Sequence, residues 1–169
     1  DFWQPISGWH GHATPFAFGH DYAPDPGIAR MLVGTAPQLG VLALEEALRV
    51  FETVDMADLR RKGQALGDLF IRLADQELSA HGFGLASPRD AAERGSQVSL
   101  THSQGYAIMQ AVIAKGVIGD FRAPDILRFG FAGLYLRYAD IWDAIAVLRE
   151  VMEGGLWDRP DYRAVKPVT

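Results

Sequence analysis

The 169-residue sequence contains no cysteine, which excludes disulfide bonds and thiolate metal sites and makes the cytoplasm the expected compartment. It also has no stretch near the roughly 18 apolar residues of a membrane-spanning helix, so we expect no membrane association. Its 16 lysine and arginine residues form no long basic block, and the net charge is −5. These properties argue against nucleic acid as a partner.

Methionine is missing from the first position, and lysine is rare. The chain opens at Asp1 with neither the basic lead nor the apolar segment of a signal peptide, so we expect further residues upstream in the natural protein. Lys62 stands in a charged helical turn, Lys115 precedes a helix-ending glycine, and Lys166 lies in the tail. None of them resembles a buried lysine that forms a Schiff base.

What the sequence does contain is enough apolar material, 49% of residues, for one domain or one domain plus a remnant. Residues 1–38 are rich in proline, glycine and aromatic residues, which predicts loops that cover a neighbouring domain or subunit. Apolar spacing predicts a connecting helix within 39–54. Residues 55–169 alternate helix and strand patterns, which predicts a small α+β domain with helices on one side of a sheet.

The expected elements of residues 55–169 follow from apolar periodicity and from capping residues. Asp55 should cap a helix that ends before Gly82, and Ser103 should cap a second helix. The tail after Trp157 is expected to be irregular. The predicted helices are 55–78, 105–115 and 140–152; the predicted strands are 83–86, 97–101 and 125–131, with an extended segment beginning at 117.

Three histidines, His10, His12 and His20, lie close together in the first loops. Imidazole is a common metal ligand, so a metal site is one interpretation. The alternative is a polar loop whose histidines bind backbone groups. Because there is no fourth ligand of the usual kind and no HExxH helix, we expect no metal.

Two residues of the first region could bind an anion. The indole N–H of Trp9 could donate to a phosphate oxygen, or Trp9 could be an ordinary buried aromatic residue. Thr35 precedes the helix at 39, where a hydroxyl and free amides would bind an anion, or it could simply cap that helix.

Arg128 stands inside an apolar strand pattern. A permanently charged guanidinium among apolar neighbours needs a partner, and a substrate carboxylate matches its fork of donors. The alternative is an arginine on the solvent face of an edge strand, which the alternation permits.

Short motifs spread over nearly the whole chain, in order, resemble bacterial kynureninases. They are residues 5–12 (PISGWHGH), 27–37 (GIARMLVGTAP), 55–62 (DMADLRRK), 93–99 (ERGSQVS), 116–122 (GVIGDFR) and 127–131 (LRFGF).

The resemblance implies the α/β fold of PLP-dependent transferases, fold type I. Residues 1–38 would then be the loop-rich end of the large pyridoxal 5'-phosphate (PLP) binding domain, and 55–169 the C-terminal small domain. It implies a homodimer that hydrolyses L-kynurenine to anthranilate and L-alanine in tryptophan catabolism. It further implies that Trp9 and Thr35 bind the PLP phosphate and that Arg128 binds the substrate α-carboxylate.

Two departures qualify the resemblance. His10 stands where the family often has phenylalanine, next to the substrate ring, so the aryl pocket should differ. The lysine that binds PLP in the family would lie upstream, so this chain alone should be inactive. The alternatives are another fold type I enzyme, similar to cysteine desulfurases or aminotransferases, and a small histidine-rich metal-binding module.

Overall fold

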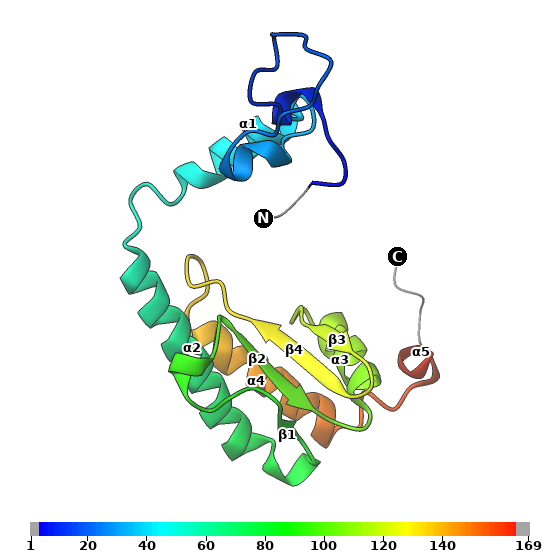
Figure 1. Cartoon of the computed structure of the whole chain (residues 1–169). Helices are drawn as coiled ribbons and strands as arrows, with labels where there is room; N and C mark the ends of the chain where they lie inside the picture. The colour runs from blue at the N-terminus through cyan, green and yellow to red at the C-terminus, as the bar shows by residue number, and fades with distance from the viewer. Residues whose placement is uncertain (1–3, 165–169) are drawn as a thin grey trace. The chain divides into compact units, whose positions relative to one another are not determined.

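A computed structural model describes residues 4–164 and divides the chain into two compact units, Asp1–Val54 and Asp55–Thr169 (Figure 1). Each unit has its own internal contacts. Within residues 4–164, no helix combines the length and the apolar character needed to cross a membrane.

The first unit consists mostly of loops. It contains two short 3-10 turns, Trp9–Gly11 and Gly27–Met31, and one regular helix, α1, at Gln38–Arg49. A single β-bridge joins His12 to Pro24. Gly11 is the only buried residue among those described in this unit.

The second unit is built on a four-stranded antiparallel sheet in the order β1-β2-β4-β3. Its strands are β1 (Gly84–Leu85), β2 (Gln97–Thr101), β3 (Asp120–Arg122) and β4 (Ile126–Gly130). β4 therefore lies between β2 and β3, and β2 and β4 form the centre of the sheet.

One face of this sheet is covered by helices (Figure 1). They are α2 (Met56–Glu77), α3 (Gly105–Ala114) and α4 (Tyr138–Glu153), with the single turn α5 (Pro160–Arg163) against α3. Strand residues that point toward the helices are buried, as are the facing helix residues, and together they form the core. It includes Leu66, Phe70, Leu78, Val98, Ile108, Val112, Leu127, Phe129, Leu148 and Val151.

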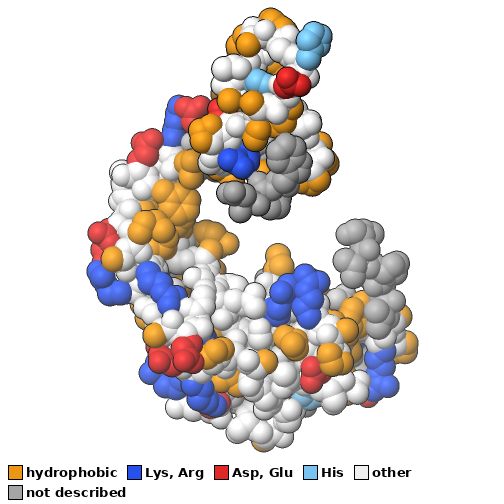
Figure 2. Space-filling model, in the orientation of Figure 1, with side chains coloured by type: hydrophobic (Ala, Val, Ile, Leu, Met, Phe, Trp, Pro, Cys, Tyr) orange, Lys and Arg blue, Asp and Glu red, His pale blue; other side chains and the backbone are white. Residues whose placement is uncertain are grey.

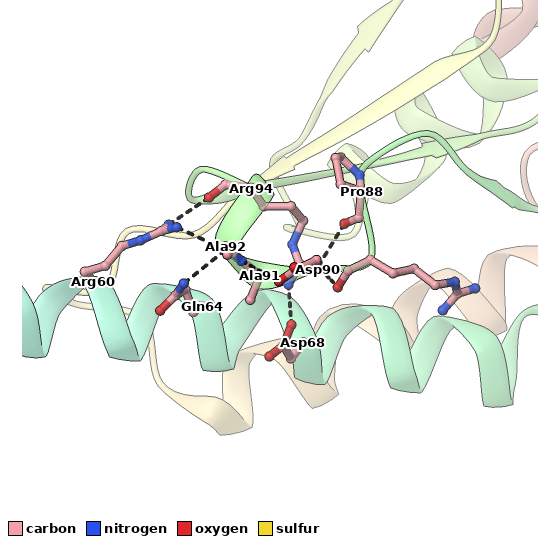
Figure 3. Close-up of polar contacts among 9 residues, drawn as sticks. Arg60, Gln64, Asp68, Pro88, Asp90, Ala91, Ala92 and Arg94 are labelled. Atoms are coloured by element: carbon pink, nitrogen blue, oxygen red, sulfur yellow. Dashed lines mark hydrogen bonds and ion pairs between the residues drawn. The ribbon is translucent and has the colours of Figure 1, made fainter.

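The segment that connects β1 to β2 is held on α2 by Arg94 (Figure 3). The Arg94 side chain is buried; it donates to the carbonyl of Pro88 (2.9 Å) and forms an ion pair with Asp68 of α2. In return, Arg60 of α2 donates to the carbonyl of Arg94 (2.8 Å), and Gln64 donates to another loop carbonyl (3.0 Å). Each of these donors satisfies a carbonyl or carboxylate that would otherwise need water.

Most of the expected elements are confirmed. The strand at 97–101 has the predicted bounds, and Asp55 caps α2 by accepting from the amide of Asp58 (2.9 Å). Gly82 does not end α2, which stops at Glu77 with Leu78 as its C-cap; its left-handed conformation (φ 78°) ends the short 3-10 helix Ser79–His81 that follows.

Two local predictions are wrong. Ser103 does not cap α3; instead His102 Nδ1 accepts from the amide of Gln104 (2.9 Å) and orders this turn. The segment expected to be extended from Val117 contains strand β3, which begins at Asp120, where pairing with β4 starts. The tail is not wholly irregular, since Pro160 begins the turn α5.

Candidate functional site

Arg128 lies at the middle of β4, on the sheet face opposite the helices. Its neighbours Leu127 and Phe129 point into the core, so the alternation of the strand directs Arg128 to the other face. The alternative of an edge-strand arginine is wrong, because β4 is paired on both sides. The side chain is 31% exposed, which leaves it accessible to a ligand.

Asp120 is the cross-strand neighbour of Arg128 on β3. Arg128 Nε donates to Asp120 Oδ2 (3.1 Å), and Arg128 Nη2 contacts the same oxygen. Arg122 Nη2 lies 3.2 Å from that oxygen as well. The hydrogen bond from Arg128, with the positive charge of Arg122, holds the pKa of the Asp120 carboxyl below its ordinary value.

Polar side chains continue across this face of the sheet. Ser99 of β2 stands opposite Arg128 on the side away from Asp120, and Gln97 donates to the Ser99 hydroxyl (3.2 Å). Figure 2 shows basic side chains gathered over β3 and β4. We call these residues the polar sheet face: Gln97, Ser99, Asp120, Arg122 and Arg128.

The polar sheet face carries a net positive charge. Two guanidinium groups share one carboxylate on it, and the other two side chains are neutral. An excess positive charge on an accessible, ordered arginine is the arrangement that binds a carboxylate from solution.

In the first unit, Trp9 is 49% exposed, so the described residues do not bury its indole. Its ring packs edge-on against Phe16 (centroids 5.5 Å apart) and against His10 (4.1 Å). His10 therefore lies directly beside the indole, and both rings stand on the 3-10 turn Trp9–Gly11.

Thr35 is exposed and does not cap a helix, which overturns that alternative. α1 begins at Gln38 with Pro37 as its N-cap, two residues beyond Thr35, and no side chain caps it. The Thr35 hydroxyl makes no hydrogen bond to any residue from 4 to 164. It is thus available as a donor to a ligand.

Close backbone packing brings the segments of Trp9 and Thr35 side by side. A Cβ on Gly8 would lie 1.8 Å from the carbonyl oxygen of Val33, and a Cβ on Gly11 would lie 2.5 Å from that of Arg30. Only glycine permits these two contacts. The glycines that flank Trp9 therefore hold its turn against the segment that leads into Thr35.

The histidine loop has the geometry of a structural loop. His12 Nδ1 accepts from the amide of Thr14 (2.8 Å), and His12 Nε2 lies 3.1 Å from the carbonyl of Asp21, to which it donates. Both ring nitrogens of His12 are thus engaged with the backbone. Among residues 4–164, no group of three or more metal-ligating side chains is placed to hold an ion.

Of the three lysines, Lys115 forms an ion pair with Glu150 of α4 (2.7 Å) at the surface. Lys62 is half-buried on α2, and Lys166 lies outside the described residues. Lys62 is on α2 and Lys115 directly follows α3, whereas the polar sheet face lies on the side of the sheet away from these helices.

Asp120 was not among the residues singled out from the sequence. It belongs to a motif with no apolar alternation of its own, and only the pairing of β3 with β4 places it beside Arg128. The signal that could have found it is Gly119. A Cβ there would lie 3.0 Å from the carbonyl oxygen of Arg128 and 2.7 Å from Met109 Cε, so this glycine marks a close backbone approach.

Comparison with known proteins connects these residues to one family. Residues 59–148 match the family model described as the kynureninase C-terminal domain. The chain is 46% identical over 168 residues to a kynureninase of Burkholderia mallei (strain SAVP1) and to one of Burkholderia pseudomallei (strain K96243), covering 99% of this chain. It is 47% identical over 166 residues to a kynureninase of Pseudomonas fluorescens, covering 98% of this chain.

The chain spans 40% of the length of each of these relatives. The match to the family model lies within the second unit, and it confirms the predicted fold class there, the C-terminal α+β small domain of a fold type I PLP enzyme. The chain therefore belongs to the kynureninase family, with residues 59–148 forming its C-terminal domain.

Proposed function

We propose that this chain is part of a PLP-dependent hydrolase that converts L-kynurenine and water to anthranilate and L-alanine. The first unit would be the end of the large PLP-binding domain, and the second the small domain. The active protein would be a cytoplasmic homodimer. The observation that carries the proposal is the identity of 46–47% to kynureninases, which extends over 98–99% of the chain and so includes both units.

The residues of the first unit are suited to a phosphate. Trp9 and Thr35 are both exposed, their segments pack together, and each offers a donor, an indole N–H and a hydroxyl. We assign them to the PLP phosphate. When bound, PLP supplies an electron sink for carbanions at the substrate carbon.

Arg128 would bind the substrate α-carboxylate. Its position on the polar sheet face leaves it accessible, and its fork of donors accepts both carboxylate oxygens. This contact would orient the amino acid before any bond is broken. His10, beside Trp9, would lie near the substrate ring and influence which aryl groups are accepted.

The test is an assay of the full-length protein with L-kynurenine, with anthranilate and L-alanine as products. Replacement of Arg128 by alanine should raise KM by about 100-fold, because a charged hydrogen-bonding pair is lost. Arg89 of the same unit is also paired with an aspartate, Asp75 (2.7 Å), and Arg89→Ala is the matched control that should leave KM unchanged.

A cysteine desulfurase or aminotransferase activity without kynurenine cleavage would contradict the proposal in favour of another fold type I enzyme. A second measurement concerns the chain by itself. The 169 residues mixed with PLP should show no absorbance band of a PLP–lysine Schiff base and no turnover, because the lysine is proposed to lie upstream. Appearance of that band would contradict this part of the proposal.

A further inference from the structure

We propose that Asp120 is a positioning residue that fixes the guanidinium of Arg128 so that one defined edge of it is presented to the substrate carboxylate. This inference rests on the proposed function of Arg128. It adds a residue whose effect would be exerted through Arg128, without contact between Asp120 and the substrate.

The contacts define which edge is used. Asp120 Oδ2 accepts hydrogen bonds from both Nε and Nη2 of Arg128, which are the donors along one side of the guanidinium. The other edge, formed by Nη1 and the second hydrogen of Nη2, makes no hydrogen bond or ion pair with the described residues. A carboxylate can therefore still bind end-on with two parallel hydrogen bonds.

The backbone of β3 places Asp120 directly beside Arg128. The two residues are cross-strand partners, so their side chains leave the sheet next to each other on the same face. Gly119 sits close to the carbonyl of Arg128: a Cβ there would lie 3.0 Å from that oxygen, which is tighter than most contacts of this kind. The position of the carboxylate is thus set by the sheet and not by a mobile loop.

The charges match this role. One carboxylate between Arg122 and Arg128 removes only part of the positive charge, so the pair orients Arg128 without cancelling the attraction for an anion. Without Asp120, the long side chain of Arg128 would sample several rotamers, and two guanidinium groups would repel each other across the strands. Binding of a carboxylate would then have to order the side chain again.

The experiment uses the full-length protein with PLP and compares Asp120→Ala and Asp120→Asn with the natural residue. Two competitive ligands separate the carboxylate from the rest of the substrate: L-alanine has an α-carboxylate, and ethylamine is the same amine without it. Asp75→Ala, which breaks the Asp75–Arg89 pair elsewhere in the unit, is the matched control.

We expect Asp120→Ala to weaken inhibition by L-alanine and to raise the KM for kynurenine by about 10- to 100-fold, as misplacement of a binding group does. The inhibition constant of ethylamine should stay unchanged, and kcat should fall by much less than KM rises. Asp120→Asn keeps an acceptor oxygen and should have an intermediate effect. Asp75→Ala should change none of these values.

The inference is overturned if Asp120→Ala weakens alanine and ethylamine equally, or affects neither. Should the alanine variant fail to fold, the nearly isosteric Asp120→Asn decides the matter by the same comparison. Failure of the proposed function has a different signature. In that case Arg128→Ala itself would leave the preference for L-alanine over ethylamine intact.

Discussion

Helices α1 and α2 stand in different units and differ in what covers their apolar residues. Leu44 of α1 is 59% exposed, and no residue of α1 is buried. Leu66 of α2 is fully buried, and so is Phe70, one turn further along that helix. Both helices have apolar residues at the spacing of one face, so their sequences alone look alike.

Apolar spacing therefore predicts a helix but does not identify the element that covers its apolar face. For α2 the partners are β2 and α4, which lie within the same unit. For α1 the other described residues of its own unit supply no comparable cover, and its exposed apolar residues are more than a stable surface helix of a single domain would carry. The kynureninase relatives are longer than this chain, and their additional residues are where we expect that cover.

The largest expected effect comes from separating the units at the Val54–Asp55 boundary. Residues 55–169 should fold alone, with a cooperative thermal transition and a stability of about 5 kcal/mol or more, because their core is contained within them. Residues 1–54 alone should show no cooperative transition. Thermal melts of the two pieces, followed by circular dichroism, provide the measurement. A sharp transition in 1–54 would show that the first unit also has a core of its own.

The next test applies one substitution to both helices. Leu66→Ala removes a fully buried side chain and should destabilise the 169-residue chain by about 3–4 kcal/mol through lost burial and a residual cavity. Leu44→Ala, at an exposed position of α1, should change the stability of the second unit by less than about 0.5 kcal/mol.

Urea denaturation measures both variants. In the full-length protein, Leu44→Ala should become more costly if the proposed cover of α1 is real. Equal costs for both substitutions in the 169-residue chain would show that α1 is already packed there.

The fold of the second unit was largely accessible from the sequence. Val98 and Leu100 alternate with polar residues, and this period of two predicts β2 directly. α2 was accessible because Asp55 is a strong cap before a long apolar stripe. The order of the strands was not, because pairing between β2 and β4 joins residues about 30 positions apart and no local pattern specifies it.

The candidate site was accessible only in part. The sequence marked three side chains as able to bind an anion: those of Trp9, Thr35 and Arg128. For each of them it also allowed an ordinary structural role. The structure removed the alternatives for Thr35 and Arg128 by showing where α1 starts and that β4 is a central strand. The ion pair between Asp120 and Arg128 needed the strand register, which sequence spacing does not give.

Arg94 offers a test of intermediate size within the second unit. Arg94→Met keeps the apolar stem but leaves the carbonyl of Pro88 and the carboxylate of Asp68 without their donor, and it should cost about 2–3 kcal/mol. Arg94→Lys should recover only part of this, because an ammonium cannot reproduce the planar fork. Urea denaturation distinguishes the two. A neutral Arg94→Met would mean that the loop is held by Arg60 and Gln64 alone.

The smallest expected effect is the pH dependence contributed by Asp75 on α2. The hydrogen bond from Arg89 lowers the pKa of Asp75 in the folded protein, so the folded state binds its proton less readily than the unfolded chain. This contribution is present above the unfolded pKa of about 3.9 and is lost as the pH falls through the lower folded value. Because both side chains are at least half exposed, solvent screening keeps it small. Asp75→Asn should therefore make the stability depend slightly less on pH below about 4. Near neutrality it should lower the stability only by the small contribution of this pair.

Added salt should shrink the difference in stability between Asp75→Asn and the natural protein, whereas the cost of Leu66→Ala should not fall with salt, since burial of apolar surface is not screened. If salt reduced both costs alike, the division between a core within the second unit and weak ion pairs on its surface would be wrong.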